Sequence, residues 1–109
     1  MEKKTYKTFK DLHFQPWLER RPDISTSPFI ADYLDAEQAI LMFPNGYGVS
    51  VLFGNVFYSD GVDTYELAVL HGNKLVYPKE VCPDEDVLGY LTKRQVTEAM
   101  KKVQDLPAK

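Results

Sequence analysis

The longest apolar stretch of the chain covers residues 39–53 and contains a turn in its middle. Apolar and other residues alternate on both sides of the turn, which is typical of two β-strands. The turn itself, residues 44–46, is Pro-Asn-Gly. Proline lacks an N–H for strand pairing but suits the second position of a type I turn. We therefore predict a three-residue hairpin loop with Gly46 in the left-handed conformation and Phe43 opposite Tyr47.

This register gives the hairpin two different faces, because alternate residues of a strand point to opposite sides. One face is wholly apolar and is expected to meet the core: Ala39, Leu41, Phe43, Tyr47, Val49, Val51 and Phe53. The other face mixes apolar with small and polar residues: Gln38, Ile40, Met42, Gly48, Ser50 and Leu52. This second face is too apolar to be left free as a patch. We expect Trp17 and Phe29, which precede the hairpin, to cover part of it.

Further strands are predicted on both sides of this hairpin. Residues 11–15 alternate apolar and polar positions before Pro16, which favours a short edge strand. Residues 65–70 are rich in β-branched and aromatic side chains, and Gly72 with Asn73 predicts a tight turn into a strand over residues 74–77.

The C-terminal region is predicted to be helical. Three acidic residues before Val87 favour one helical turn at residues 84–88. Thr92 and Gln95 then match a capping box that opens a helix over residues 93–106. Its apolar residues recur at helical spacing in one stripe: Val96, Ala99, Met100, Val103 and Leu106. The predicted fold is α+β, an antiparallel β-meander of three to five strands with this helix packed on one face.

Length and composition indicate one soluble globular domain over residues 1–109, with residues 1–5 disordered. The 44% hydrophobic and 27% charged content is ordinary for such a domain. A net charge of −3 disfavours nucleic-acid binding, for which a basic surface is needed. The single cysteine, Cys82, excludes an internal disulfide and favours a reducing compartment. Without a long apolar run or a leader, we expect a cytoplasmic protein with no membrane association.

Catalytic chemistry has little support in the sequence. The two histidines, His13 and His71, fall on different predicted strands. No nucleophile and base have a recognised spacing, and no glycine-rich loop precedes a helix to hold a phosphate. We therefore predict no enzymatic activity, no catalytic residue and no cofactor.

Two acidic groups leave metal binding open, although neither predicts a metal site. Three acids recur at three-residue intervals, but without the alternating oxygen ligands of an EF-hand, which favours a solvated loop: Asp60, Asp63 and Glu66. The other three are consecutive, so that their side chains do not converge on one point: Asp84, Glu85 and Asp86.

Two surfaces are candidates for binding a partner. The first is the mixed face of the hairpin, with Ile40, Met42, Ser50 and Leu52. The second is the loop with Trp17, Arg20 and Arg21. An exposed tryptophan beside arginines has the composition of an interface hot spot. A single tryptophan in a small domain is, however, more often buried.

Three stretches of sequence form a pattern: PNGYGVSVLFG at residues 44–54, YELAVL at residues 65–70 and DEDVLGYLTKRQVTEAMKKVQDL at residues 84–106. Together they resemble small proteins of unassigned function that bacteriophages and prophages encode. The resemblance implies a phage or mobile-element origin and assigns no catalytic or binding residue. Residues 16–35 match nothing in it.

These observations predict a small non-enzymatic protein that binds or regulates another protein. The phage resemblance implies a host protein as the target, in the host cytoplasm. One alternative is a self-assembling structural homo-oligomer, with the mixed face forming a homodimer. A less favoured alternative is nucleic-acid binding through the N-terminal arm, residues 1–10, which contains four lysines.

Overall fold

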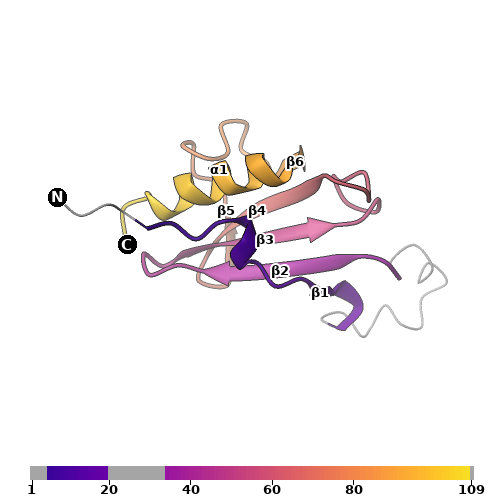
Figure 1. Ribbon diagram of the computed structural model, residues 1–109. Helices are drawn as coiled ribbons and strands as arrows, with labels where there is room; N and C mark the ends of the chain where they lie inside the picture. Colours follow the sequence, from indigo (N-terminus) through magenta and orange to yellow (C-terminus); the bar gives the residue numbers. More distant parts are fainter. Residues whose placement is uncertain (1–4, 20–33, 109) are drawn as a thin grey trace.

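The computed structural model describes residues 5–19 and 34–108. A six-stranded antiparallel sheet and one C-terminal helix form two layers (Figure 1). In chain order, with η for a 3₁₀ helix, the elements are η1 (Phe9–Asp11), β1 (Gln15–Pro16), η2 (Trp17–Glu19), β2 (Glu37–Met42), β3 (Tyr47–Phe53), β4 (Tyr65–His71), β5 (Lys74–Val76), β6 (Leu88–Leu91) and α1 (Lys93–Gln104). The predicted α+β class is confirmed, with one strand more than expected. Residues 1–4, most of the segment predicted to be disordered, lie outside the described residues.

The sheet is a meander in which neighbours in sequence pair with each other. The strand order is β1-β2-β3-β4-β5, and β6 also pairs with β4. β5 pairs with the end of β4 at residues 69–71, whereas β6 pairs with its beginning at residues 65–67. Both strands therefore share one edge of β4.

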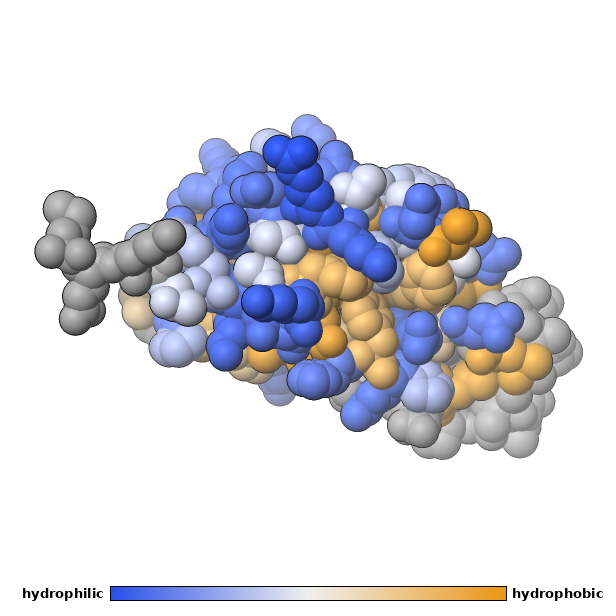
Figure 2. All heavy atoms as spheres, in the orientation of Figure 1, coloured by the Kyte–Doolittle hydropathy of each residue, from blue (hydrophilic) through white to orange (hydrophobic). Residues whose placement is uncertain are grey.

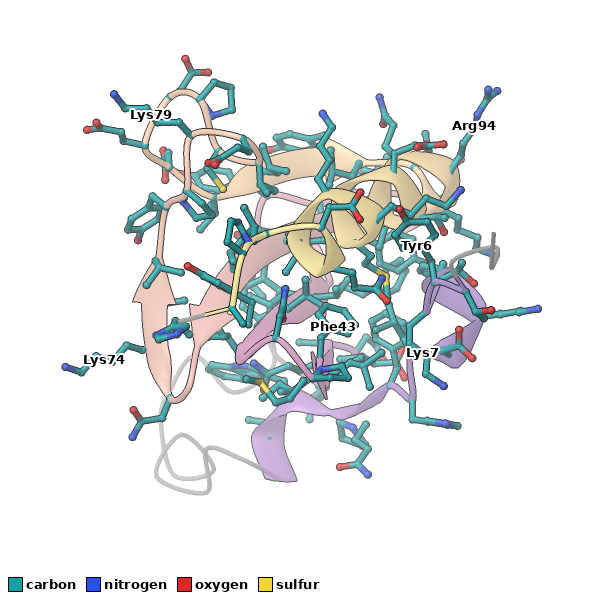
Figure 3. The ribbon with its side chains drawn as sticks, turned by 90° about the vertical axis from the view of Figure 1, so that its left-hand side faces the viewer. Tyr6, Lys7, Phe43, Lys74, Lys79 and Arg94 are labelled. Atoms are coloured by element: carbon teal, nitrogen blue, oxygen red, sulfur yellow. The ribbon has the colours of Figure 1, made fainter. Side chains whose placement is uncertain are left out.

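The central hairpin has the predicted register. The Phe43 N–H donates to the Tyr47 carbonyl at 2.7 Å, and the Gly46 N–H donates to the Phe43 carbonyl at 3.1 Å. Gly46 has a φ of +90°, on the left-handed side. Leu41 lies opposite Val49. In Figure 3, Phe43 lies between α1 and the hairpin, on the core side.

The helix begins as predicted and ends slightly earlier. The Gln95 N–H donates to Thr92 Oγ1 at 3.2 Å, and the Thr92 N–H donates to Gln95 Oε1 at 2.9 Å. At the other end, Asn45 Nδ2 donates to the carbonyls of Val103 at 2.9 Å and Leu106 at 3.0 Å. The Asn45 side chain thus satisfies carbonyls at the end of α1 that would otherwise need further helical hydrogen bonds. The whole predicted stripe is buried.

The chain before the hairpin differs from the prediction. The Thr8 N–H donates to Asp11 Oδ2 at 2.8 Å, and the Asp11 N–H donates to the Thr8 carbonyl at 2.9 Å. This local capping produces the 3₁₀ helix η1 where the start of an edge strand was expected. Strand pairing begins only at Gln15, and Pro16 lies in an edge strand, where proline is tolerated.

The helical turn predicted at residues 84–88 was wrong. Residues 83–86 form a turn and a bend, and the chain then enters β6. Leu88 lies opposite Leu67, and Leu91 lies opposite Tyr65. Pairing with a distant strand and burial of leucine against the core prevail here over the local helix signal.

The N-terminal arm closes the open side between helix and sheet. The Lys7 N–H donates to Gln104 Oε1 at 2.9 Å, and the Phe9 N–H donates to Thr97 Oγ1 at 3.0 Å. Figure 1 shows the arm running beside α1. The outer surface of α1 is hydrophilic, whereas hydrophobic residues gather below it, over β2 and the chain before β1 (Figure 2).

Candidate protein-binding surface

The sheet has one face toward α1 and one face away from it. On the first face, Ala39, Val49 and Val51 are fully buried. The strand register puts Ile40 beside Ser50 and Ser50 beside Ala68 on the second face. A second row on that face follows from the same pairings: Met42, Gly48, Leu70 and Leu75. We call these two rows the outer sheet face.

The outer sheet face partly covers itself. A Cβ atom on Gly48 would lie 2.7 Å from the carbonyl oxygen of Leu41 and would collide with the Met42 side chain. The absence of a side chain at Gly48 therefore lets Met42 lie across β3. Gln38 Nε2 donates to Ser50 Oγ at 2.9 Å. These two contacts shield the small residues in the middle of the sheet.

Three large apolar side chains of this face remain in contact with solvent. Ile40 is 41% exposed, Met42 is 44% exposed and Leu75 is 55% exposed. Ser50, predicted as a contact residue, is only 7% exposed, and Leu52 is half-buried. The accessible part of the predicted surface is therefore Ile40 and Met42, and the structure adds Leu75. Met42 and Leu75 lie at the two ends of one row, with Gly48 and Leu70 between them. Exposed apolar side chains on one face can contact another protein through apolar burial.

The second predicted surface, around Trp17, is described only in part. The Trp17 ring packs on Phe57 with ring centroids 5.6 Å apart, and the backbone N–H of Trp17 donates to the Ala36 carbonyl at 2.8 Å. Trp17 is half-buried. Arg20, Arg21 and Phe29 lie outside the described residues, so that the hot-spot and cover interpretations stay predictions.

The carboxylate of Asp60 holds its own loop together. Asp60 Oδ1 accepts from the N–H groups of Val62 at 2.9 Å, Asp63 at 3.0 Å and Thr64 at 3.0 Å. The bonds from Val62 and Asp63 contribute most to keeping the pKa of Asp60 well below its usual value. Glu66 Oε1 accepts from the Tyr58 N–H at 3.1 Å. Asp60 and Glu66, two of the three acids that recur at three-residue intervals, thus accept hydrogen bonds from backbone N–H groups.

The acids at residues 84–86 lie next to a buried thiol. Asp86 Oδ1 accepts from the Val87 N–H at 2.7 Å. Cys82 is only 1% exposed. Its burial, and to a smaller degree the charge of Asp86, raises the pKa of the thiol. A thiol of this kind is a poor nucleophile at neutral pH.

Several hollows lie outside the outer sheet face. One, of about 260 Å³, is lined mainly by loop residues that include Asp35, Asn55 and Asp60. A second, of about 460 Å³, lies where the segment after α1 meets β3, β4 and the chain after β5. Its lining residues are Tyr47, His71, Val76, Tyr77, Pro78, Glu80, Leu106 and Pro107. We call this second hollow the C-terminal groove.

Leu75 and the C-terminal groove were both missed by sequence reasoning. A signal existed for Leu75, since a two-residue turn at Gly72 and Asn73 sets the register that places it beside Leu70. No local signal existed for the groove, because its walls come from four separate parts of the chain.

No protein-family model matches this chain, and no similar protein was found among curated proteins or solved structures. The resemblance to phage-encoded proteins stays a prediction. Within residues 5–19 and 34–108, no three His, Cys, Asp or Glu side chains gather as metal ligands, and no helix is long and apolar enough to cross a membrane.

Proposed function

We propose that this protein is a non-enzymatic accessory protein that binds, and thereby regulates, another protein through its outer sheet face. The exposure of three apolar side chains on one face of the sheet supports the proposal: Ile40 and Met42 on β2, and Leu75 on β5, in the same row as Met42 with Gly48 and Leu70 between them. If the protein is of phage origin, as the sequence pattern implies, a host protein is the expected target.

The chemistry of this face favours a protein partner. Its accessible side chains are aliphatic or a thioether, and such groups gain free energy by burial against other apolar groups. Methionine is also flexible and polarizable, so Met42 can adjust its conformation to a partner surface. Lysine and arginine are absent from the outer sheet face, whereas nucleic-acid binding depends on them.

A second copy of the chain is the alternative partner. The two rows of the outer sheet face contain no charged residue, and the nearest one on this side of the sheet, Glu66, lies one row away, opposite Leu52. Two such faces can therefore pack together as stacked sheets over these two rows. This alternative makes the protein a structural homo-oligomer.

Aspartate at two exposed positions tests both forms of the proposal. We expect Ile40→Asp and Leu75→Asp to abolish capture of a partner from host lysate, because each buries a charge in the interface. If the partner is a second copy, sedimentation velocity should instead show a dimer that both variants convert to monomer. Val62→Asp is the matched control, since Val62 is 77% exposed and lies in the loop between β3 and β4.

Two results would contradict the proposal. Variants that keep the wild-type partner and the wild-type sedimentation coefficient would show that this face is not an interface. Variants that lose their circular dichroism spectrum while Val62→Asp stays folded would show that the face belongs to the core.

A further inference from the structure

The C-terminal groove has the size of a small-molecule site. Its volume of about 460 Å³ falls within the range of roughly 300–1,000 Å³ that ligand pockets occupy. Four parts of the chain form its walls: the start of β3, the end of β4, residues 76–80 and the segment that follows α1. It lies apart from Ile40 and Met42, which do not line it.

Aromatic rings supply much of the lining. The rings of Tyr47 and His71 pack with centroids 4.7 Å apart. Tyr77, also in the lining, is 42% exposed. The face of an aromatic ring carries a partial negative charge and attracts a cation that lies over it.

The charge that lines the groove is negative, like the faces of the aromatic rings. Glu80 lines it, and no lysine or arginine of the described residues does. Leu106 and Pro107 follow the C-terminal end of α1, where the helix dipole is negative. Two cations near it in sequence, Lys74 and Lys79, point outward from the body of the protein (Figure 3).

We propose that the C-terminal groove binds an organic cation, an alkylammonium head group held between the tyrosine rings and the carboxylate of Glu80. The same chemistry is shared by a free quaternary amine and by a lysine side chain of another protein. An anion would meet the carboxylate of Glu80 and the negative end of the α1 dipole here. This inference does not depend on the outer sheet face.

Titration of the ¹⁵N-labelled protein with choline, followed by NMR at pH 8, tests the proposal. We expect saturable shifts at the amides of His71, Tyr77 and Glu80. The uncharged isostere 3,3-dimethylbutan-1-ol should bind about 3-fold to 30-fold more weakly, the range expected for one cation–π contact. Nα-acetyl-lysine-amide and its Nε-trimethyl form are titrated in parallel. Their affinities, compared with that of choline, show whether a lysine side chain is bound better than a free quaternary amine.

Variants separate the two groups that are proposed to hold the cation. Tyr77→Ala and Glu80→Gln should each weaken choline binding several-fold, whereas Tyr77→Phe keeps the ring and should bind as the wild type does. Tyr90→Ala removes another exposed tyrosine, which does not line the groove, and should have no effect. All of these positions are exposed, so we expect the variants to fold.

Equal affinity for choline and its uncharged isostere would overturn the proposal, because the groove would then be only an apolar hollow. Absence of saturable shifts in the wild-type protein would overturn it as well. Saturable choline shifts that Tyr77→Ala and Glu80→Gln leave unchanged would place the cation elsewhere and would equally refute it.

Discussion

Replacement of Met100 by alanine tests how the helix is held on the sheet. Met100 is fully buried on α1, which packs on β3 and β4. The change removes three heavy atoms, each similar to a methylene group that contributes about 0.8 kcal/mol when buried. Loss of transfer free energy is therefore about 2.4 kcal/mol, and the cavity that remains adds to it, toward a total of about 2–5 kcal/mol.

Urea unfolding followed by circular dichroism measures this loss. A small domain has an m value of about 1–3 kcal/mol per molar urea. With m at about 2, a loss of about 2–5 kcal/mol corresponds to a fall in the midpoint of about 1–2.5 M, with m unchanged. Lys102→Ala, at an exposed position of the same helix, is the control and should change stability by less than about 0.5 kcal/mol. A loss for Met100→Ala as small as that of the control would mean that α1 does not pack on the sheet through this residue.

Three further predictions concern polar and titratable groups. Asn45→Ala should cost about 1–3 kcal/mol in urea unfolding, because the carbonyls of Val103 and Leu106 lose their donor. Burial, together with Glu37 and Asp63, raises the pKa of Tyr65. The raised pKa stabilises the folded protein fully below the ordinary tyrosine pKa near 10. This stabilisation is lost as pH rises through the higher pKa that Tyr65 has in the folded protein. In Tyr65→Phe, the melting temperature should therefore fall less than in the wild type as pH is raised above about 10. Cys82 should react with a thiol reagent at neutral pH only as fast as the protein unfolds; rapid labelling of the native protein would contradict its burial.

The central hairpin and the helix were predictable because their signals are local. Pro44 and Gly46 restrict the backbone strongly enough to select one loop length, and the loop length fixes the register of β2 and β3. Thr92 and Gln95 likewise start α1 at one position. Each signal lies within a few residues of the structure that it determines.

β6 could not be predicted, because its cause is distant in sequence. The acids at residues 84–86 are compatible with a helix start, and Gly89 weakens any strand pattern. What selects the strand is the free edge of β4 at residues 65–67 and the burial of Leu88 and Leu91 against the core. Neither is visible in the local sequence.

The outer sheet face was predicted in outline, but its accessible part was not. The register already placed Ile40, Met42 and Ser50 on one side. Which of them meets solvent depends on side-chain contacts across strands, in which Gln38 covers Ser50 and Met42 lies across Gly48. Such contacts follow from rotamers, and alternation alone does not give them.

The two proposed sites can be perturbed separately because of the alternation along β5. Leu75 lies opposite Leu70 on the outer sheet face, while the next residue, Val76, lies opposite Val69 on the core face and lines the C-terminal groove. Substitutions at sites without shared partners have effects that add. Leu75→Asp should therefore leave choline affinity unchanged, and Glu80→Gln, in the chain after β5, should leave partner capture unchanged. A partner on the outer sheet face would then leave the groove open, so that cation and protein can bind at the same time.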